Sequence, residues 1–308
     1  MTAIGLLIVS HNGGNLLDQC LATITHHCNR NSYSLIVVDN ASDDEVTVEV
    51  LEKWASLENT TIVRNTVNKG YAQAVNSGLG YLVENQTRIE YLFIINQDIA
   101  ILNDSCINIP HFMAQDTQIG ICGPRLINRD GSIQNSCYAF PSIFKKLIQL
   151  LGFQALVPVS LLTRIPESVL SYFPGYVRYF ALNYSSSEQP VEVPWITGAF
   201  MVVKMDVFNE LSSFDERFSL YGEDMDFCLR ARKLGLKVYY HPQARVLHHG
   251  GARPAFRSEM LFSTFFNSMT YFYQKHYAGM RMRILLALNY LEFLKEKRLF
   301  FKAGAPEK

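Results

Sequence analysis

Short apolar, β-branched runs alternate with amphipathic segments through the first part of the chain, and this alternation limits the possible folds more than any other feature. The runs have the composition of buried strands; they are Ile4–Val9, Leu35–Val38, Thr61–Val63 and Tyr91–Ile95. The segments between them place apolar residues at helical spacing; they are Leu16–Thr25, Val46–Trp54 and Ala72–Val83. Strands that alternate with helices build βαβ units. The sequence therefore predicts an α/β fold with a mostly parallel central sheet flanked by helices.

Polar residues follow each of these predicted strands. In open α/β sheets, ligands bind in the crevice beyond the carboxyl ends of the strands. The residues at those ends are Ser10-His11-Asn12, Asp39-Asn40, the loop Arg64–Gly70 and Asn96-Gln97-Asp98. We therefore expect a ligand site along this edge of the sheet.

Two common nucleotide-binding fingerprints do not fit the sequence. The stretch Gly78-Leu79-Gly80 has Val83 where the third glycine of a dinucleotide fingerprint belongs, and it lies inside a predicted helix instead of after the first strand. The phosphate loop Gly-x-x-x-x-Gly-Lys-Ser/Thr does not occur in the chain. Because a parallel sheet hosts many functions, the ligand has to be identified from the site residues themselves.

The composition is that of a globular protein without a nucleic-acid signature. Hydrophobic residues make up 48% of the 308 residues, which suffices for one large domain or one domain with an appendage. Lys and Arg together number 28, as do Asp and Glu, so no basic excess points to nucleic acid. The six cysteines form no Cys-x-x-Cys pair, and their scatter is more typical of a reducing cytoplasm than of a disulfide scaffold.

Neither a secretory signal nor a transmembrane segment is expected. The N-terminal apolar run Ile4–Val9 is short and has no basic segment before it. The most extended later candidate, Leu147–Leu162, is interrupted by Gln149, Gly152, Gln154 and Pro158. These features predict a protein of the cytoplasm.

The pattern changes after Gly120. The further predicted elements are a strand and hairpin at Cys122–Ile133 with a turn at Asp130-Gly131, a strand within Val191–Lys204, a helix at Asp224–Lys233, strands at Val238–Tyr240 and Ala244–Leu247, and helices from Phe256 onward. The aromatic, proline-punctuated stretch at about 140–190 is interpreted as an insertion lying over the sheet. We expect a domain at 1–250, with a nucleotide-binding half at 1–100 and an acceptor and catalytic half at 120–250, followed by a helical extension at 251–308.

Several motifs, taken in order, resemble those of family 2 glycosyltransferases with the GT-A fold, and within that family the rhamnosyltransferase-like branch. The residues that carry the resemblance are Val9-Ser10-His11-Asn12, Val37-Val38-Asp39-Asn40-Ala41-Ser42, Asn68-Lys69-Gly70-Tyr71-Ala72, Asn96-Gln97-Asp98, Trp195-Ile196-Thr197-Gly198-Ala199, Gly222-Glu223-Asp224-Met225-Asp226 and His248-His249. Each motif is weak alone, but their order from about Ile4 to Gly250 makes chance a poor explanation. The resemblance implies an inverting transfer of a sugar from a nucleotide-sugar donor to an acceptor hydroxyl.

On the donor side, the resemblance implies that Asp39 recognises a pyrimidine base, since a carboxylate there can accept a hydrogen bond from the N3–H of uracil or thymine. The alternative is a loop aspartate that caps a helix. Lys69 and nearby backbone N–H groups could meet phosphate, although a solvated loop explains them equally well. The predicted donor-binding residues are Ser10, Asn12, Asp39, Arg64, Asn68, Lys69, Gly70, Asn96 and Gln97.

A divalent metal, Mg²⁺ or Mn²⁺, is expected to neutralise the charge of the diphosphate leaving group. The family usually has Asp-x-Asp where this chain has Asn96-Gln97-Asp98, so Asp98 is the remaining carboxylate and the predicted ligand. The resemblance adds His248, because a histidine at this place completes the metal site or contacts the diphosphate. The alternatives are a turn aspartate and a structural histidine, and the sequence leaves open whether His248 or His249 acts.

The acidic run Glu223-Asp224-Met225-Asp226 precedes a predicted helix and holds more carboxylates than helix capping needs. An inverting transfer requires a base that takes the proton of the acceptor hydroxyl. The resemblance makes Asp224 that base and leaves Glu223 and Asp226 to position the acceptor or neighbouring groups. Clustered carboxylates raise one another's pKa values, which suits a base.

The predicted acceptor-binding residues are Trp195, Thr197 and Gly198. Trp195 can stack on a sugar face and Gly198 permits close approach, although a core position would also explain the tryptophan. The helices from Phe256 onward end in a basic, amphipathic stretch, and acceptors in the family are often lipid-linked. We therefore also predict peripheral contact with the inner face of the plasma membrane through these C-terminal helices.

The leading hypothesis is an inverting glycosyltransferase that uses dTDP-L-rhamnose, or another dTDP- or UDP-sugar, and a surface-glycan or lipid-linked acceptor. A nucleotidyltransferase is one alternative, because such enzymes share a similar α/β fold, but Ser10–Gly14 lacks the basic residues of their phosphate loop. A non-catalytic protein that binds glycans or sugar nucleotides is another, motivated by the incomplete Asp-x-Asp motif.

Overall fold

The computed structural model describes residues 4–28, 33–57, 59–85, 88–151, 186–250 and 259–302. Its first elements are β1 (Ile4–Ser10), α1 (Gly14–His27), β2 (Tyr33–Asp39), α2 (Glu45–Ala55), β3 (Thr60–Arg64), α3 (Tyr71–Glu84) and β4 (Tyr91–Asn96). Strand and helix alternate as the apolar periodicity predicts, and each boundary lies within a few residues of the expected one.

The second part of the chain contains shorter strands and the C-terminal helices. Its elements up to the insertion are β5 (Ile99–Ile101), α4 (Ser105–Ala114), β6 (Ile119–Ile127), β7 (Ile133–Gln134), β8 (Cys137–Tyr138) and α5 (Ile143–Leu151). Its later elements are β9 (Val191–Glu192), β10 (Trp195–Ile196), β11 (Phe200–Lys204), α9 (Met205–Glu210), α10 (Glu223–Lys233), β12 (Lys237–His248), α11 (Glu259–His276) and α12 (Gly279–Lys302).

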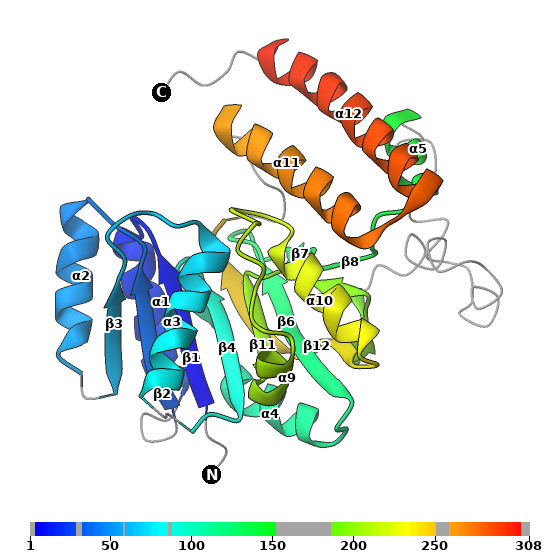
Figure 1. The fold of residues 1–308 in the computed structure, drawn as a ribbon. Helices are drawn as coiled ribbons and strands as arrows, with labels where there is room; N and C mark the ends of the chain where they lie inside the picture. The colour runs from blue at the N-terminus through cyan, green and yellow to red at the C-terminus, as the bar shows by residue number, and fades with distance from the viewer. Residues whose placement is uncertain are drawn as a thin grey trace.

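One large sheet runs through the molecule in the order β3-β2-β1-β4-β11-β6-β12-β5 (Figure 1). The strands β3, β2, β1 and β4 are parallel to their neighbours, whereas β11 is antiparallel to both β4 and β6. Because two reversals restore the direction, β6 and β12 point the same way as β1 to β4. The predicted α/β fold with a mostly parallel central sheet is therefore confirmed.

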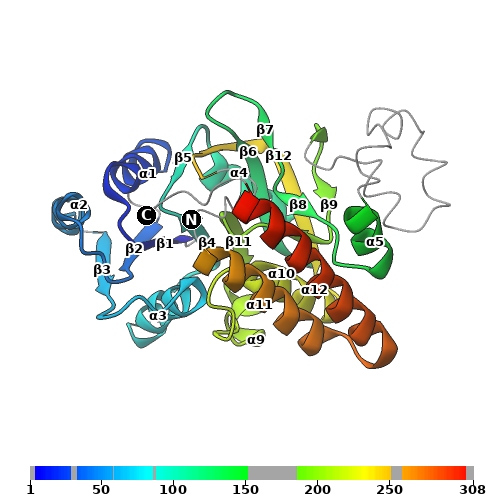
Figure 2. The ribbon, with the colours of Figure 1, turned by 90° about the horizontal axis from the view of Figure 1, so that it is seen from above.

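Helices cover both faces of this sheet (Figure 2). Side chains of α1, α2 and α4 share a core with one face, and side chains of α3, α9 and α10 share a core with the other. Successive residues of a strand point to opposite faces, so Leu6 and Ile8 belong to the first core and Leu7 and Val9 to the second. Burial on both faces explains why the strands are continuous apolar runs in the sequence.

The two strands predicted near the end of the sheet are one strand in the structure. β12 continues through both predicted segments, and its register against β6 shifts between His241 and Arg245. Pro242 and Gln243 interrupt the apolar pattern at this irregularity, which made it resemble a loop in the sequence. The long strand ends at His248, on the same edge of the sheet as the carboxyl ends of β1, β2 and β4.

The predicted insertion at about 140–190 is described only in part, because residues 152–185 lie outside the described residues. Its first helix, α5, packs against α12 and does not lie on the sheet. Lys146 of α5 donates to Asn289 of α12 at 3.3 Å and forms an ion pair with Glu292. The helix α5 therefore extends the C-terminal helices. The last described residues of the segment contact the sheet instead, since Ser187 O accepts from Arg125 of β6 at 2.6 Å and Glu188 O accepts from Gln243 of β12 at 2.7 Å.

A disulfide bond joins Cys28, at the end of α1, to Cys106 in α4. The scattered cysteines were expected to be reduced, and for this pair the expectation is wrong. The two residues are 78 positions apart in the sequence, and they meet because α1 and α4 cover the same face of the sheet. The other four cysteines, Cys20, Cys122, Cys137 and Cys228, are buried.

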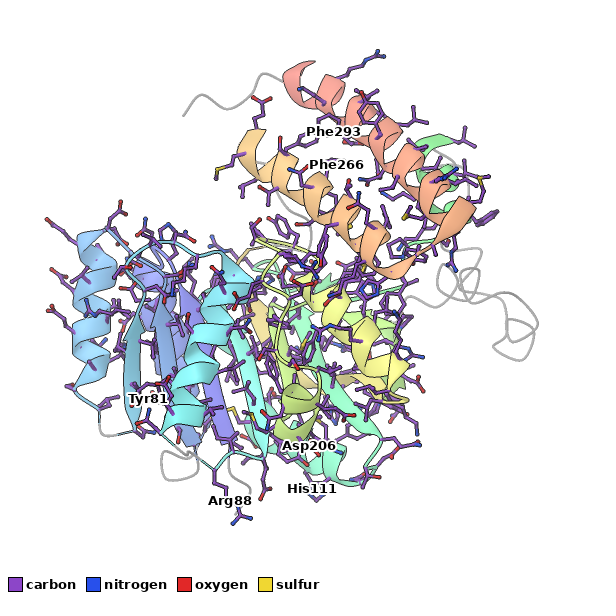
Figure 3. The ribbon with its side chains drawn as sticks, in the orientation of Figure 1. Tyr81, Arg88, His111, Asp206, Phe266 and Phe293 are labelled. Carbon is purple, nitrogen blue, oxygen red and sulfur yellow. A yellow bond between two sulfur atoms is a disulfide. The ribbon has the colours of Figure 1, made fainter. Side chains whose placement is uncertain are left out.

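The C-terminal helices α11 and α12 form an antiparallel hairpin beside the carboxyl edge of the sheet (Figure 1). Phe266 of α11 and Phe293 of α12 lie between the two helices, with ring centroids 5.3 Å apart (Figure 3). On its other side, α11 packs Met269 and Phe272 against Phe218. None of the described helices is long and apolar enough to cross a membrane.

Candidate active site

Several predicted donor-binding residues lie side by side at the carboxyl edge of the sheet. The strand register pairs Ser10 with Asp39 and Asp39 with Arg64. Gln97 joins the loop after β1 to the turn after β4, since its Oε1 accepts from Ser10 Oγ at 2.8 Å and from His11 N at 2.9 Å. The structure thus uses the buried Ser10 and the amide of Gln97 to shape the edge of the site.

Two further predicted donor-binding residues, Asn12 and Asp39, already form hydrogen bonds within the protein. The amide of Asn12 makes two bonds with Asp43, one to its carboxylate at 2.8 Å and one from its backbone N–H at 3.0 Å. One carboxylate oxygen of Asp39 accepts from Ser42 N at 3.0 Å. Asn12 therefore shapes the loop, whereas Asp39, only 5% exposed, lies at a strand end where a base could be recognised.

The loop after β3 is folded around Asn40, a residue that was not predicted to belong to the site. Its Oδ1 accepts from Asn65 Nδ2 at 3.0 Å and from Lys69 N at 3.1 Å, and its Nδ2 donates to Asn68 Oδ1 at 2.9 Å. The side chain of Asn68 therefore already has a hydrogen-bond partner within the loop. Arg64, Lys69 and Asn96, by contrast, make no side-chain hydrogen bond or ion pair among the described residues, and the two cations are exposed. The sequence signal for Asn40 was its place directly after Asp39.

Gly70 brings the donor-side loop against the segment that precedes α10. Its φ is +80°, and an added Cβ would lie 2.4 Å from the backbone oxygen of Ser219. The next residue, Tyr71, donates its N–H to the same oxygen at 3.1 Å. Only glycine accommodates both the backbone angle and this close approach.

Asp98 and His248 come together at the end of β4 and the end of β12. Asp98 Oδ1 lies 3.5 Å from His248 Nε2. The other ring nitrogen of His248 lies 2.6 Å from Gln134 Oε1, which can only accept. His248 therefore donates from Nδ1 to Gln134, and this bond turns its Nε2 toward Asp98. Gln134 was not predicted, and nothing in its sequence surroundings marked it.

The structure distinguishes the two adjacent histidines. His249 Nδ1 accepts from Arg129 Nε at 2.9 Å, so this ring faces Arg129 while His248 faces Asp98. Burial, together with the positive charge of Arg129, lowers the pKa of His249. Of the pair, His248 is the residue placed to act with Asp98.

The pair Asp98 and His248 has the chemistry of a partial metal site. Burial raises the pKa of Asp98, but the hydrogen bond and charge of His248 outweigh it, so the net shift is downward and the carboxylate is ionised. An added Cβ at Gly250 would lie 2.6 Å from Asp98 and 3.1 Å from His248, so the glycine keeps this place open. No third His, Cys, Asp or Glu joins them among the described residues. An ionised carboxylate and an oriented imidazole fit a divalent cation that takes its other ligands from a diphosphate and water.

The acidic motif opens helix α10. Gly222, with φ +91°, starts the helix in a left-handed conformation, and Asp224 follows in the first turn. Asp224 Oδ2 accepts from Gly198 N at 2.8 Å, and Oδ1 accepts from Met225 N at 2.7 Å. Burial raises the pKa of Asp224 more than these N–H groups lower it. The carboxylate is therefore fixed in orientation and more basic than an ordinary aspartate.

Glu223 lies next to Asp224 and is almost fully buried, with 5% of its surface exposed. Its Oε2 atom has no hydrogen-bond partner within the part of the chain that the structure describes. Burial, followed by the negative charge of Asp224, raises the pKa of Glu223 well above its ordinary value. The two residues therefore form a coupled acidic pair in which Glu223 is the more strongly protonated member.

Tyr71 connects the donor side to the acidic motif, and it was not among the predicted site residues although it lies in a quoted motif. Its hydroxyl donates to Gly198 O at 3.1 Å. Burial raises the pKa of Tyr71 well above its ordinary value, and the charges of Glu223, Asp224 and Asp98 raise it further. Carboxylates from both halves of the site are thus within electrostatic reach of one tyrosine.

The predicted acceptor-binding residues lie on β10 and on the short segment that joins β10 to β11. Trp195 stacks on Tyr138 with ring centroids 4.9 Å apart, and it is partly exposed. Its Nε1 atom has no hydrogen-bond partner among the described residues. Thr197 donates its backbone N–H to Ser136 O at 2.9 Å, which leads the chain to Gly198 beside Asp224. The tryptophan is therefore both a packing residue and part of an aromatic surface.

Asp226 differs from the other acidic residues in its surroundings. Its side chain is 0% exposed and pairs with Arg230, Lys275 and His276. A carboxylate so enclosed is not available to an acceptor, so of its two predicted roles only the positioning of neighbouring groups fits the structure. Its place in a run of carboxylates gave no sign of these partners, because two of them lie in α11.

Two family descriptions match this chain. The model of Glycosyl transferase family 2 matches residues 6–158, and that of Glycosyl transferase family group 2 matches residues 148–290. An N-acetylglucosaminyl-diphospho-decaprenol L-rhamnosyltransferase of Mycobacterium tuberculosis is 26% identical over 79% of this chain and 75% of its own length. Rhamnosyltransferase WbbL of Escherichia coli is 21% identical over 79% of this chain and 82% of its own length.

Solved structures share the fold. A mannosyltransferase of Pyrobaculum calidifontis, in complex with GDP-Man and Mn²⁺, superposes with a TM-score of 0.56 at 17% identity, covering 99% of this chain and 76% of the other. A structure of GalNAc-T7 with UDP, GalNAc and Mn²⁺ gives a TM-score of 0.58 at 14% identity, covering 99% of this chain and 58% of the other. Identities this low support a common fold, and the site has to be argued from its own residues.

Proposed function

Because the chain belongs to the family 2 glycosyltransferases and has the GT-A fold, we propose that it transfers L-rhamnose from dTDP-L-rhamnose, with inversion, to a hydroxyl of a lipid-linked glycan. The rhamnosyltransferase relatives support the sugar, and the decaprenol-linked acceptor named for one of them supports the acceptor class. Membership of this family also argues against the alternatives of a nucleotidyltransferase and of a non-catalytic binding protein.

The arrangement of Asp224 carries the proposal. This carboxylate is held by two backbone N–H groups, has a raised pKa, and lies with Asp98 in the electrostatic environment of Tyr71. A base at this place takes the proton of an acceptor hydroxyl while the hydroxyl oxygen attacks the anomeric carbon. The hydroxyl attacks from the face opposite the nucleoside diphosphate, whose bond to the sugar breaks with its electron pair on the leaving oxygen, so the sugar configuration inverts.

The remaining roles follow from position. Asp98 and His248 would hold a divalent metal, which when bound neutralises negative charge on the diphosphate. Asp39, at the end of β2, would recognise the pyrimidine, and the exposed Arg64 and Lys69 would meet the donor's phosphates. Trp195, on its stack with Tyr138, offers an aromatic surface to the acceptor sugar.

The test is a transfer assay with a panel of UDP-, dTDP- and GDP-sugars, a synthetic lipid-diphosphate-GlcNAc acceptor, and Mg²⁺, Mn²⁺ or EDTA. We expect metal-dependent transfer from dTDP-L-rhamnose, with an anomeric configuration in the NMR spectrum of the product that is opposite to that of the donor. Transfer from another donor would refute the rhamnose assignment, and retention of configuration would refute the base assigned to Asp224.

The outer face of α12 supports a second part of the proposal, peripheral contact with a membrane. Apolar residues recur there at intervals of three, four and seven residues, so they form one stripe along the helix. They are between 36% and 68% exposed, and they are Met280, Ile284, Leu291 and Leu294. The opposite face is buried, as Leu285 and Asn289 show. An apolar stripe on the solvent side of a helix has no role in the core.

The charge beside this stripe favours an anionic bilayer over a second copy of the chain. α12 contains six basic residues and two acidic ones, and Arg283 and Arg298 lie close to the stripe in helical register. Two such faces would repel each other, whereas anionic headgroups would attract both. We therefore propose that α12 lies on the membrane surface that holds the lipid-linked acceptor.

Vesicle flotation tests this contact. The double variant Ile284→Glu/Leu291→Glu should bind vesicles that contain phosphatidylglycerol roughly tenfold or more weakly than wild type, because two apolar anchors are lost. Ile107→Glu, which changes a more exposed apolar residue on α4, should bind like wild type. Equal flotation of all three proteins, or none for wild type, would refute the proposed surface.

A further inference from the structure

A buried ion cluster joins α10, which carries the acidic motif, to α11 of the C-terminal hairpin. Its centre is the Asp226 carboxylate, two residues after Asp224. Asp226 Oδ1 accepts from His276 Nε2 and from Lys275 Nζ, each at 2.6 Å, and Oδ2 accepts from Arg230 Nε at 2.8 Å. A fully buried carboxylate requires such partners, since an unpaired charge in the interior is strongly destabilising.

His276 is oriented as a donor within this cluster. Its side chain is 3% exposed, and its Nδ1 atom lies 3.1 Å from Lys233 Nζ. An ammonium group only donates, so Nδ1 accepts and the ring proton is on Nε2, facing Asp226. Both nitrogens of the ring are therefore engaged by α10, one at its first turn and one at its last.

Further contacts attach α11 to the segment before α10. Lys275 bridges to Asp215, with Nζ 2.7 Å from its Oδ2. Ser268 Oγ donates to Leu220 O at 2.9 Å, and the methyl group of Met269 would lie 3.1 Å from a Cβ at Gly222. One face of α11 thus follows the segment from residue 215 to the start of α10.

The same segment touches the donor side on its other flank. The backbone oxygen of Ser219 accepts from Tyr71 N of the donor side, and Asp224 accepts from Gly198 N of the acceptor-side segment. The residues that carry the catalytic carboxylate therefore lie between the donor side and α11. A displacement of α11 would change the position of Asp224, although no residue of α11 needs to touch a substrate.

We propose that Lys275 and His276 are positioning residues for the reaction: by holding Asp226 they fix the first turn of α10 and with it the Asp224 carboxylate. The inference rests on the proposed role of Asp224 as base. Catalysis of this kind is sensitive to small displacements, and an error of about 1 Å at the reacting groups costs up to about 10²-fold in rate.

The test compares His276→Ala, His276→Gln and Lys275→Met with Glu259→Gln. Glu259, at the opposite end of α11, is 3.8 Å from Lys297 in an exposed pair, so its variant changes the hairpin without touching α10. We expect His276→Ala to lower kcat about 10- to 100-fold with donor and acceptor KM within about twofold. His276→Gln should regain most of that loss, because the glutamine amide can still donate to Asp226. Lys275→Met should fall between the two.

Hydrogen exchange supplies a second readout that does not depend on activity. His276→Ala should accelerate exchange of backbone amides at residues 222–228 and leave those of β1 and β4 unchanged. A kcat loss no larger than that of Glu259→Gln would overturn the proposal, as would a loss of protection that extends equally through the sheet. If Asp224→Asn retained full kcat, the base assignment would fail, while the exchange at residues 222–228 would still decide whether α11 holds α10.

Discussion

Different interactions position the two sides of the active site. The donor edge, defined here as residues 10–14, 39–43, 64–71 and 96–98, is held by neutral amide and backbone groups such as those of Gln97 and Asn40. The acid segment, defined as residues 214–226, is held by buried ion pairs such as Asp226 with Lys275. Neutral bonds fix the first side through the strand register, whereas the second depends on a helix some 50 residues further along the chain.

The difference shows how the two sides can fail. A loop built on adjacent parallel strands keeps its shape as long as the sheet is intact, so its variants should change donor or metal affinity. A segment held by paired charges from another element can shift while the sheet remains folded. Variants there should change turnover more than binding.

The largest effect is expected for Asp224→Asn in the acid segment. Loss of the general base should lower kcat by about 10³-fold, while the Kd for the nucleotide sugar, measured by calorimetry, stays near the wild-type value. In wild type, the raised pKa of Asp224 should place the acidic limb of kcat/KM above the value of about 3.9 for an ordinary aspartate. Glu84→Gln, an exposed change at the end of α3, is the control. A full loss of donor binding in Asp224→Asn would erase the contrast between the two sides.

A smaller effect is expected at Asp98 and His248, the pair that we propose to hold the metal beside the donor edge. His248→Gln and Gln134→Leu should each raise the concentration of Mn²⁺ needed for half-maximal activity about 10- to 100-fold, since one removes a ligand and the other its orienting bond. His249→Gln is the matched control, because that ring faces Arg129. Metal titrations of donor hydrolysis provide the measurement. Equal shifts for both histidine variants would show that the rings are not distinguished as the structure places them.

The smallest effect concerns stability. The folded protein holds the proton of Glu223 more tightly than the unfolded chain does, so this residue reduces the free energy of unfolding as pH rises through its raised pKa. Glu223→Gln removes that penalty, and we expect its Tm at pH 8 to exceed that of wild type by about 2–4 °C. The gain should disappear as pH falls below about 4.3, where glutamate is protonated in both states. Calorimetric scans across this range, with Glu84→Gln beside them, would contradict the argument if Tm fell at pH 8.

Most of the fold could be predicted from the sequence because both faces of the strands are buried. Continuous apolar runs such as Leu35–Val38 identify strands whatever their partners, and the polar residues after them mark one edge of the sheet. The pattern failed at β12, where Pro242 interrupts a strand that the sheet nevertheless continues. It also failed for Cys28 and Cys106, because α1 and α4 become neighbours only in the tertiary structure, which the sequence pattern does not show.

The site residues that lie in short motifs could be predicted from the sequence. The residues that orient them from distant elements could not. Asp98 and His248 were expected to lie together, and the structure brings them to 3.5 Å. Gln134, which orients the histidine, lies on a two-residue strand with no periodic signal. Asp226 was assigned from its neighbours in the sequence, whereas its actual partners, Lys275 and His276, are distributed over another helix.

The contact at Gly70 has a consequence for engineering and for evolution. Because this residue lies against the backbone of Ser219 without room for a side chain, the loop that we propose to meet the donor and the segment that carries the proposed base cannot vary independently. A chimera that imports the donor loop of a relative would displace the base unless it also imported the partner segment. New donor preferences in such a scaffold should therefore arise through paired changes on both sides of this contact, inherited as one unit.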